Sequence, residues 1–188
     1  AEKVAGKSSG GSVDLIWVNG ENFASLKRDG LLRADDWAFG LPSFAYTDSK
    51  TLPAILSDFA VPTDGQESPW GRAQLVFAYD SRYAETPPRS AAALAKWIGA
   101  NPGRFSYPQS PDFTGTSFLK QIALELAPDR SVFMMPAETA DKDAALGPLW
   151  QWLETVHPDL WRGGTSYPAN YTDMVQLLGD GELSFAMA

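Results

Sequence analysis

The sequence predicts an α/β fold in which strands alternate with helices, and three observations support this. Residues 13–18 (VDLIWV) form an apolar run with one acid between glycines, which is typical of a buried strand. Residues 72–79 (RAQLVFAY) have the composition of a second strand. From residue 142 to 156, apolar side chains recur at helical spacing. The alternation after residue 72 indicates a layered domain with a parallel or mixed sheet flanked by helices.

The first strand leads into a polar turn and a short helix. The turn covers residues 19–22 (NGEN), and the helix covers residues 23–28 and is closed by Gly30. Residues 31–69 contain scattered prolines and acids, and we expect irregular covering structure there, with one short helix near residues 48–57.

The second half of the chain contains clearer helix signals. Ser90 is placed to cap an alanine-rich helix over residues 91–100, which an Asn-Pro-Gly sequence ends. The remaining expected elements are a strand at 104–107, helices at 115–126, 142–156 and 170–178, and a strand at 183–187.

Composition excludes several classes of function. Of the 188 residues, 15 are basic and 23 acidic, a net charge of −8, so nucleic acid and acidic membranes are poor partners. The absence of cysteine removes thiol catalysis, cysteine-based zinc sites and disulfides. The single histidine, His157, is followed by Pro158, which predicts a helix-end or surface role for it. We expect no metal site and no cofactor.

The loop that follows the expected strand at 104–107 is the richest in polar groups. Hydroxyl and carboxylate side chains gather there around one glycine, just before a helix, where unpaired backbone N–H groups attract anionic or dipolar ligands. The same residue types are also ordinary helix caps, and Thr114 or Thr116 could have only that role. The residues concerned are Ser110, Asp112, Thr114, Gly115, Thr116 and Ser117.

The tryptophans divide into expected core residues and one expected contact. Trp150 and Trp97 follow the apolar faces of their helices, and Trp17 lies inside the first strand, so packing is the expectation for all three. Trp70 precedes the strand at 72–79 and is placed to stack on a flat or cationic solute. The neighbouring Asp35 and Asp36 point in different directions in an extended segment, which argues against a catalytic pair.

Three segments together resemble a known family. VDLIWVNGENF at 13–23, SPDFTGTSF at 110–118 and SYPANYTDMVQLLGDGELSFAM at 166–187 resemble the periplasmic solute-binding proteins of ABC transporters, of type II fold, and within them a YnjB-like branch. The resemblance implies two α/β lobes that close on a solute in the cleft between them. Residues 1–71 would be part of lobe one, 72–182 lobe two, and 183–188 a strand returning toward lobe one. We expect the chain to be an interior segment of a longer protein.

The resemblance also implies where the solute binds, because ligands of open α/β sheets lie at strand ends and helix N-termini. Asn22 and Asn170 could instead be helix caps. The expected ligand contacts are Asn19, Glu21, Asn22, Trp70, Ser110, Asp112, Thr114, Gly115, Thr116, Tyr167, Asn170 and Tyr171.

The resemblance predicts a periplasmic, monomeric binding component of an ABC importer that captures a small solute and delivers it to the membrane permease. One alternative is a hydrolase-like enzyme that uses Glu21 or Asp112 as acid or base, with the N–H groups of residues 114–117 stabilising an anion. Another is an iron-type receptor. That relative usually presents adjacent tyrosines, whereas Tyr167 and Tyr171 are four residues apart here, which argues against a metal site.

Overall fold

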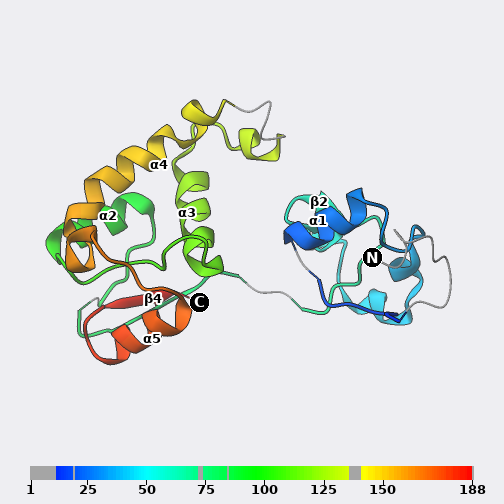
Figure 1. The fold of residues 1–188 in the computed structure, drawn as a ribbon, viewed down its shortest axis with the longest axis horizontal. Coiled ribbons are helices and arrows are strands. Elements are labelled where there is room, and N and C mark those ends of the chain that lie inside the picture. The colour runs from blue at the N-terminus through cyan, green and yellow to red at the C-terminus, as the bar shows by residue number, and fades with distance from the viewer. Residues whose placement is uncertain (1–11, 19, 72–73, 84, 136–140, 188) are drawn as a thin grey trace. The chain divides into compact units, whose positions relative to one another are not determined.

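A computed structural model describes residues 12–18, 20–71, 74–83, 85–135 and 141–187. The chain divides into two compact units, which are described separately (Figure 1): unit 1 is Ala1–Arg72 and unit 2 is Ala73–Ala188. Helices and short strands occur in both units, so the α/β character predicted from the sequence is confirmed. Whether the units correspond to the two predicted lobes stays a prediction.

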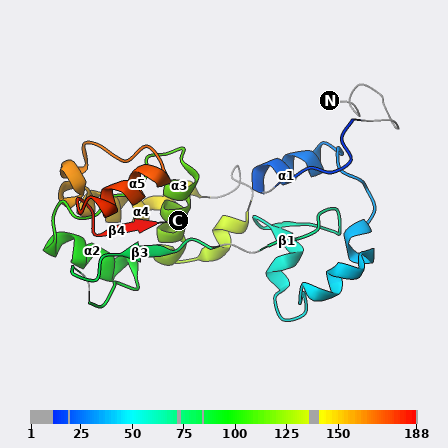
Figure 2. The same ribbon diagram turned by 90° about the horizontal axis from the view of Figure 1, so that it is seen from below.

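The described part of unit 1 is built on one α-helix and a small hairpin. Helix α1 (Gly20–Arg28) buries Phe23 completely and lies beside the antiparallel pair of β1 (Ser57–Asp58) and β2 (Val61–Pro62), as Figure 2 shows. Hydrogen bonds join the two: the Gly20 N–H donates to the Asp58 carboxylate, and the Lys27 ammonium donates to the Pro62 carbonyl. The segment between them is a series of 3₁₀ turns, at Trp37–Gly40, Pro42–Tyr46 and Pro53–Leu56.

The predicted first strand is wrong. Residues 13–18 form no strand, and their side chains are largely exposed, with Trp17 at 72%. An apolar run becomes a strand only where a neighbouring strand accepts its backbone hydrogen bonds, and no described segment of unit 1 pairs with it. The helix after it begins at Gly20 instead of residue 23, and the short helix expected near residues 48–57 is only the 3₁₀ turn Pro53–Leu56.

Unit 2 is dominated by four helices. These are α2 (Ala91–Ala100), α3 (Phe113–Leu126), α4 (Lys142–Val156) and α5 (Tyr171–Gly179), and their predicted positions are confirmed within two residues. The cap predicted at Ser90 is confirmed, because Ser90 accepts the N–H of Ala93, and Asn170, for which capping was the open alternative, accepts that of Asp173. In Figure 1, α5 lies on one side of β4 and helices α2, α3 and α4 lie on the other. Shorter 3₁₀ turns lie at Arg130–Met134, His157–Asp159 and Trp161–Gly164.

The sheet of unit 2 is smaller than predicted and is antiparallel. Strand β3 (Phe77–Tyr79) pairs with β4 (Phe185–Met187), with Phe77 opposite Met187. The expected strand at 104–107 is absent, although residues 105–108 are buried. The backbone of this segment bonds to irregular structure instead: the Trp161 N–H donates to the Phe105 carbonyl and the Ser184 N–H to the Arg104 carbonyl. Residues 105–108 are therefore buried without pairing as a strand of a sheet.

The core of unit 2 is an aromatic cluster around α3. Phe118 lies 5.8 Å from Phe105 and 6.1 Å from Trp152, measured between ring centroids. Trp152 is only 8% exposed and its Nε1 donates to the Ala91 carbonyl at 2.9 Å. Trp150, by contrast, is 52% exposed, so the expectation that it belongs to the core is wrong. The helical period puts Trp152 on the buried face with Leu149, Leu153 and Val156, and turns residue 150 outward.

Two further predicted packing roles have different outcomes. Trp97 packs edge-on against Phe185 at 4.7 Å, which confirms its place at the core, whereas Trp17 is exposed and contacts the similarly exposed ring of Trp70 at 4.1 Å. Within the described ranges, no helix has the length and apolar character needed to cross a membrane.

Unit 1 contains a carboxyl group with an altered proton affinity, which generates a prediction. Burial, followed by the negative charge of Asp58, raises the pKa of Glu67 to about 7. A carboxyl whose pKa is higher in the folded state stabilises the fold at low pH, and that stabilisation is lost as the pH rises through about 7. We expect the free energy of unfolding of the wild type to fall relative to that of Glu67→Gln between about pH 4.5 and 8.

Urea unfolding of both proteins across this pH range measures the difference in their free energies of unfolding. Hydrogen exchange of the α1 amides is a second measurement of the same difference. A constant difference between wild type and variant over the whole range would contradict the prediction.

Candidate functional site

The loop before α3 is organised by Asp112, which caps the helix. Its Oδ1 accepts the N–H groups of Thr114, at 2.9 Å, and Gly115, at 3.0 Å, and its carbonyl accepts that of Thr116. The cap expected at Thr114 or Thr116 is therefore wrong. The N–H groups of residues 114–116, which were candidates for anion binding, therefore already donate to an acceptor within the chain. The peptide bond between Ser110 and Pro111 is cis.

Gly115 is required by packing rather than by ligand contact. A Cβ built at this position would lie 1.9 Å from the carbonyl oxygen of Pro108, a backbone atom that cannot move aside easily. Both Thr114 and Gly115 are buried. The first turn of α3 thus lies directly against the buried segment 105–108, and this contact determines how the two segments are spaced.

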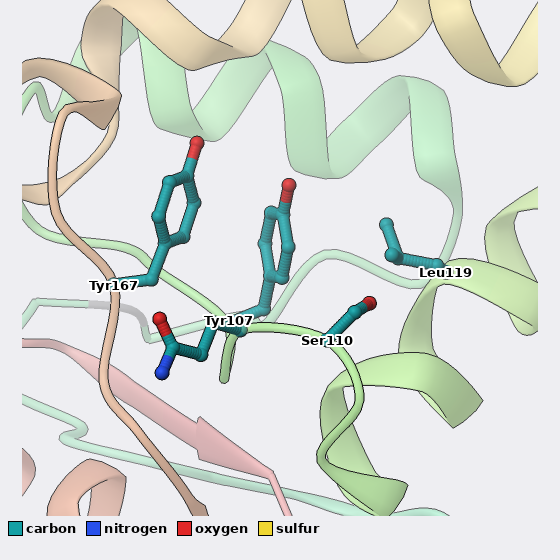
Figure 3. Close-up of a pocket in the computed structure, with 5 residues that line it drawn as sticks. Tyr107, Ser110, Leu119 and Tyr167 are labelled. Atoms are coloured by element: carbon teal, nitrogen blue, oxygen red, sulfur yellow. The ribbon is translucent and has the colours of Figure 1, made fainter.

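An open pocket of about 250 Å³ lies beside this loop in unit 2. Figure 3 shows the rings of Tyr107 and Tyr167 side by side with their hydroxyls directed the same way, and Ser110 and Leu119 on the other side of Tyr107. The two tyrosine rings are 5.2 Å apart. The lining residues are Tyr107, Gln109, Ser110, Leu119 and Tyr167. Two of the expected contacts, Ser110 and Tyr167, are therefore brought together.

The pocket is connected to the end of α4 through the hydroxyl of Tyr107. That hydroxyl shares a 2.8 Å hydrogen bond with Nε2 of His157, and Tyr167 packs at 6.0 Å from the same imidazole. Burial, followed by the interaction with Tyr167, raises the pKa of Tyr107 above its usual range, and burial lowers the pKa of His157. His157 does end its helix as predicted, but it is half-buried and supports a pocket residue.

The other expected contacts of unit 2 do not line the pocket. Asn170 uses its side chain to cap α5, which was the alternative open for it, and the neighbouring Tyr171 is 44% exposed. The main chain still links this segment to the pocket, because the Gln109 N–H donates to the Pro168 carbonyl at 2.9 Å. Among the residues that the structure describes, no group of three His, Cys, Asp or Glu side chains is arranged to hold a metal ion.

The expected contacts in unit 1 stay predictions. Glu21 and Asn22 are exposed on the first turn of α1, so the role of Asn22 as a cap is wrong, since the helix begins before it. Trp70 is 78% exposed and contacts Trp17. Asn19 lies outside the described residues.

Sequence reasoning missed three of the five lining residues and the histidine behind them. The sequence predicts Tyr107 in a strand and Leu119 inside a helix. It gives no expectation for Gln109, which lies between two prolines. No local pattern indicated the contact with His157, which is 50 residues away.

The contact between Gly115 and Pro108 predicts that adding one methyl group here destabilises the protein. We expect Gly115→Ala to lower the free energy of unfolding by about 1–3 kcal/mol, because the new Cβ overlaps a backbone oxygen. The matched control is Gly147→Ala in α4, where a Cβ meets no atom within 4 Å outside its own turn; that variant should gain about 0.5–1 kcal/mol of helix propensity. Urea unfolding of both measures the contrast, and equal effects would refute it.

The burial of His157 predicts a pH dependence of unit 2. Because the folded-state pKa lies below the ordinary value of 6.5, protonation favours the unfolded state, and stability falls as the pH drops through 6.5. We expect this loss between about pH 7.5 and 5.5 in the wild type and its absence in His157→Gln. Hydrogen exchange of α4 amides in both proteins measures it; parallel pH curves would show that His157 does not contribute.

Comparison with known proteins places this architecture in a family. The family model for bacterial extracellular solute-binding proteins matches residues 1–188, which is the whole chain. The protein YnjB of Escherichia coli strain K12 is 45% identical over 186 residues, which cover 99% of this chain and 47% of YnjB, so the chain spans about half the length of that relative. No solved structure matches the chain at a significant level. The chain therefore belongs to the bacterial extracellular solute-binding proteins, a family with a periplasmic-binding-protein-like fold.

Proposed function

We propose that this protein is the solute-binding component of an ABC importer, which captures a small solute outside the cytoplasmic membrane, in the periplasm, and delivers it to the permease. Family membership supports the binding role. The observation that carries the proposal is the pocket of unit 2, whose lining includes two tyrosines, Gln109 and Ser110 beside a packed aromatic core. Such a lining, apolar with a few polar groups, is typical of small-molecule sites.

The chemistry of the pocket favours holding a solute over transforming one. The carboxylate nearest to the loop, that of Asp112, is engaged in capping α3, and the N–H groups of residues 114–116 are bonded to it. A hydrolase-like mechanism built on Asp112 would need these groups for proton transfer and for anion stabilisation. The aromatic and hydroxyl groups that remain can stack on a solute and hydrogen-bond to it.

The proposed contacts are the pocket residues together with those that the family resemblance implies. In unit 2 the first set is Tyr107, Gln109, Ser110, Leu119 and Tyr167. The exposed Tyr171 and the unit 1 residues Asn19, Glu21, Asn22 and Trp70 stay candidate contacts. Asp112, Thr114, Gly115, Thr116 and Asn170 support the site through capping and packing instead.

Titration of the intact protein against sugars, nucleosides, amino acids and inorganic phosphate tests the proposal. We expect one class to bind and to raise the unfolding temperature, and we expect Tyr167→Ala to weaken that binding about tenfold because one ring contact is lost. Isothermal titration calorimetry measures both effects. The control is Trp150→Ala, which removes an exposed ring of α4 that does not line the pocket.

Binding that is equally sensitive to both variants, or turnover of a bound compound without release of it intact, would overturn the proposal.

A further inference from the structure

The lining of the pocket carries no charge at neutral pH. Its polar groups are the Gln109 amide, the Ser110 hydroxyl and the hydroxyls of two tyrosines, and its remaining side chain is that of Leu119. Among the described residues that line it there is no lysine, arginine, aspartate or glutamate. A charged solute that loses water on entering such a site finds no opposite charge to replace its hydration, which makes its binding costly.

The helix N-terminus next to the pocket is closed to anions. The N–H groups of Thr114, Gly115 and Thr116 are all bonded to Asp112. An anion at this helix end would have to displace a carboxylate that is covalently part of the loop. That carboxylate also satisfies the positive end of the helix dipole, so an anion gains little there.

The groups behind the tyrosines are also uncharged. The hydroxyl of Tyr107 is bonded to the imidazole of His157 at 2.8 Å, instead of to an ammonium or guanidinium group. Burial lowers the pKa of His157 and raises that of Tyr107, so both remain neutral near pH 7. The arginines and lysines that do contact rings in the described part of the chain stack on Phe23, Tyr83 and Trp161, outside the pocket.

We propose that this pocket selects an uncharged, ring-bearing solute with several hydroxyl groups. This inference rests on the proposed binding function and names its substrate class. A ring of the solute packs against Tyr107 and Tyr167, while its hydroxyls exchange hydrogen bonds with Gln109 and Ser110, each of which both donates and accepts. The volume of about 250 Å³ lies below the roughly 300–1,000 Å³ of ordinary ligand pockets, which suits one or two rings and not an oligomer.

Titration of the intact protein with D-glucose, uridine, glutamate, choline and inorganic phosphate tests the selection by charge. We expect glucose or uridine to bind, with an affinity that changes less than twofold between about 0.05 and 0.5 M NaCl, because salt screens only charged partners. Binding of glutamate, choline or phosphate in preference to both neutral compounds would overturn the inference.

An isosteric variant gives a second and independent readout of the same property. Gln109→Glu adds one negative charge to the pocket without a change of shape, and Gln151→Glu adds the same charge at an exposed position of α4. For an uncharged solute, we expect Gln109→Glu to weaken binding by no more than about tenfold, because a carboxylate accepts hydrogen bonds but does not donate them, and we expect the affinity to remain independent of salt. A tenfold gain in affinity would identify a cationic solute. A tenfold loss of affinity with strong salt dependence would identify an anionic solute, and either result would overturn the inference.

The failure of the inference is distinguishable from that of the binding function. If a charged solute binds and Tyr167→Ala weakens that binding, the binding function is supported and only the assignment of an uncharged solute class is overturned. Binding of none of the five probes, together with no thermal stabilisation by the wider panel, would overturn both.

Discussion

The carboxylate of Asp112 determines where α3 begins, and the arrangement of the pocket depends on that position. By accepting the N–H groups of Thr114 and Gly115, it fixes the first turn of the helix. The turn then packs so closely on the Pro108 carbonyl that only glycine fits at position 115. Tyr107, the next residue along this buried segment, is thereby held at the pocket. A cap worth about 1 kcal/mol locally thus has consequences for the geometry of the whole site.

The pocket is continuous with the core of unit 2, which accounts for its chemical character. Tyr107 contacts Phe118 at 5.3 Å, and Phe118 contacts both Phe105 and Trp152. One face of the Tyr107 ring therefore belongs to the core while its hydroxyl is bonded to His157. Side chains whose rotamers are held by packing and hydrogen bonds keep a binding site in one geometry. A low-polarity surrounding of this kind also disfavours charges, both on the protein and on a solute.

Features that depend on residues close together in the sequence were predicted correctly, whereas features that depend on distant segments were not. The helix positions of unit 2 and the cap Ser90 were predicted correctly, because capping and helical periodicity involve residues within four positions of one another. The strands at 13–18 and 104–107 were wrong, because a strand depends on a partner that lies elsewhere in the chain. The core role expected for Trp150 was wrong, since Trp152, two residues further along the helix, faces the opposite side and is the buried ring.

The sequence by itself determined the α/β class and the main helices, since these depend on composition and on neighbouring residues. It also contained the resemblance that the family match confirms. Only the tertiary structure decided that Asp112 caps α3, that Gly115 packs on Pro108, and that Tyr107 meets a histidine 50 residues away. The physical reason is that a binding pocket is formed by side chains from distant segments, whose juxtaposition depends on packing of the whole unit and leaves no local pattern.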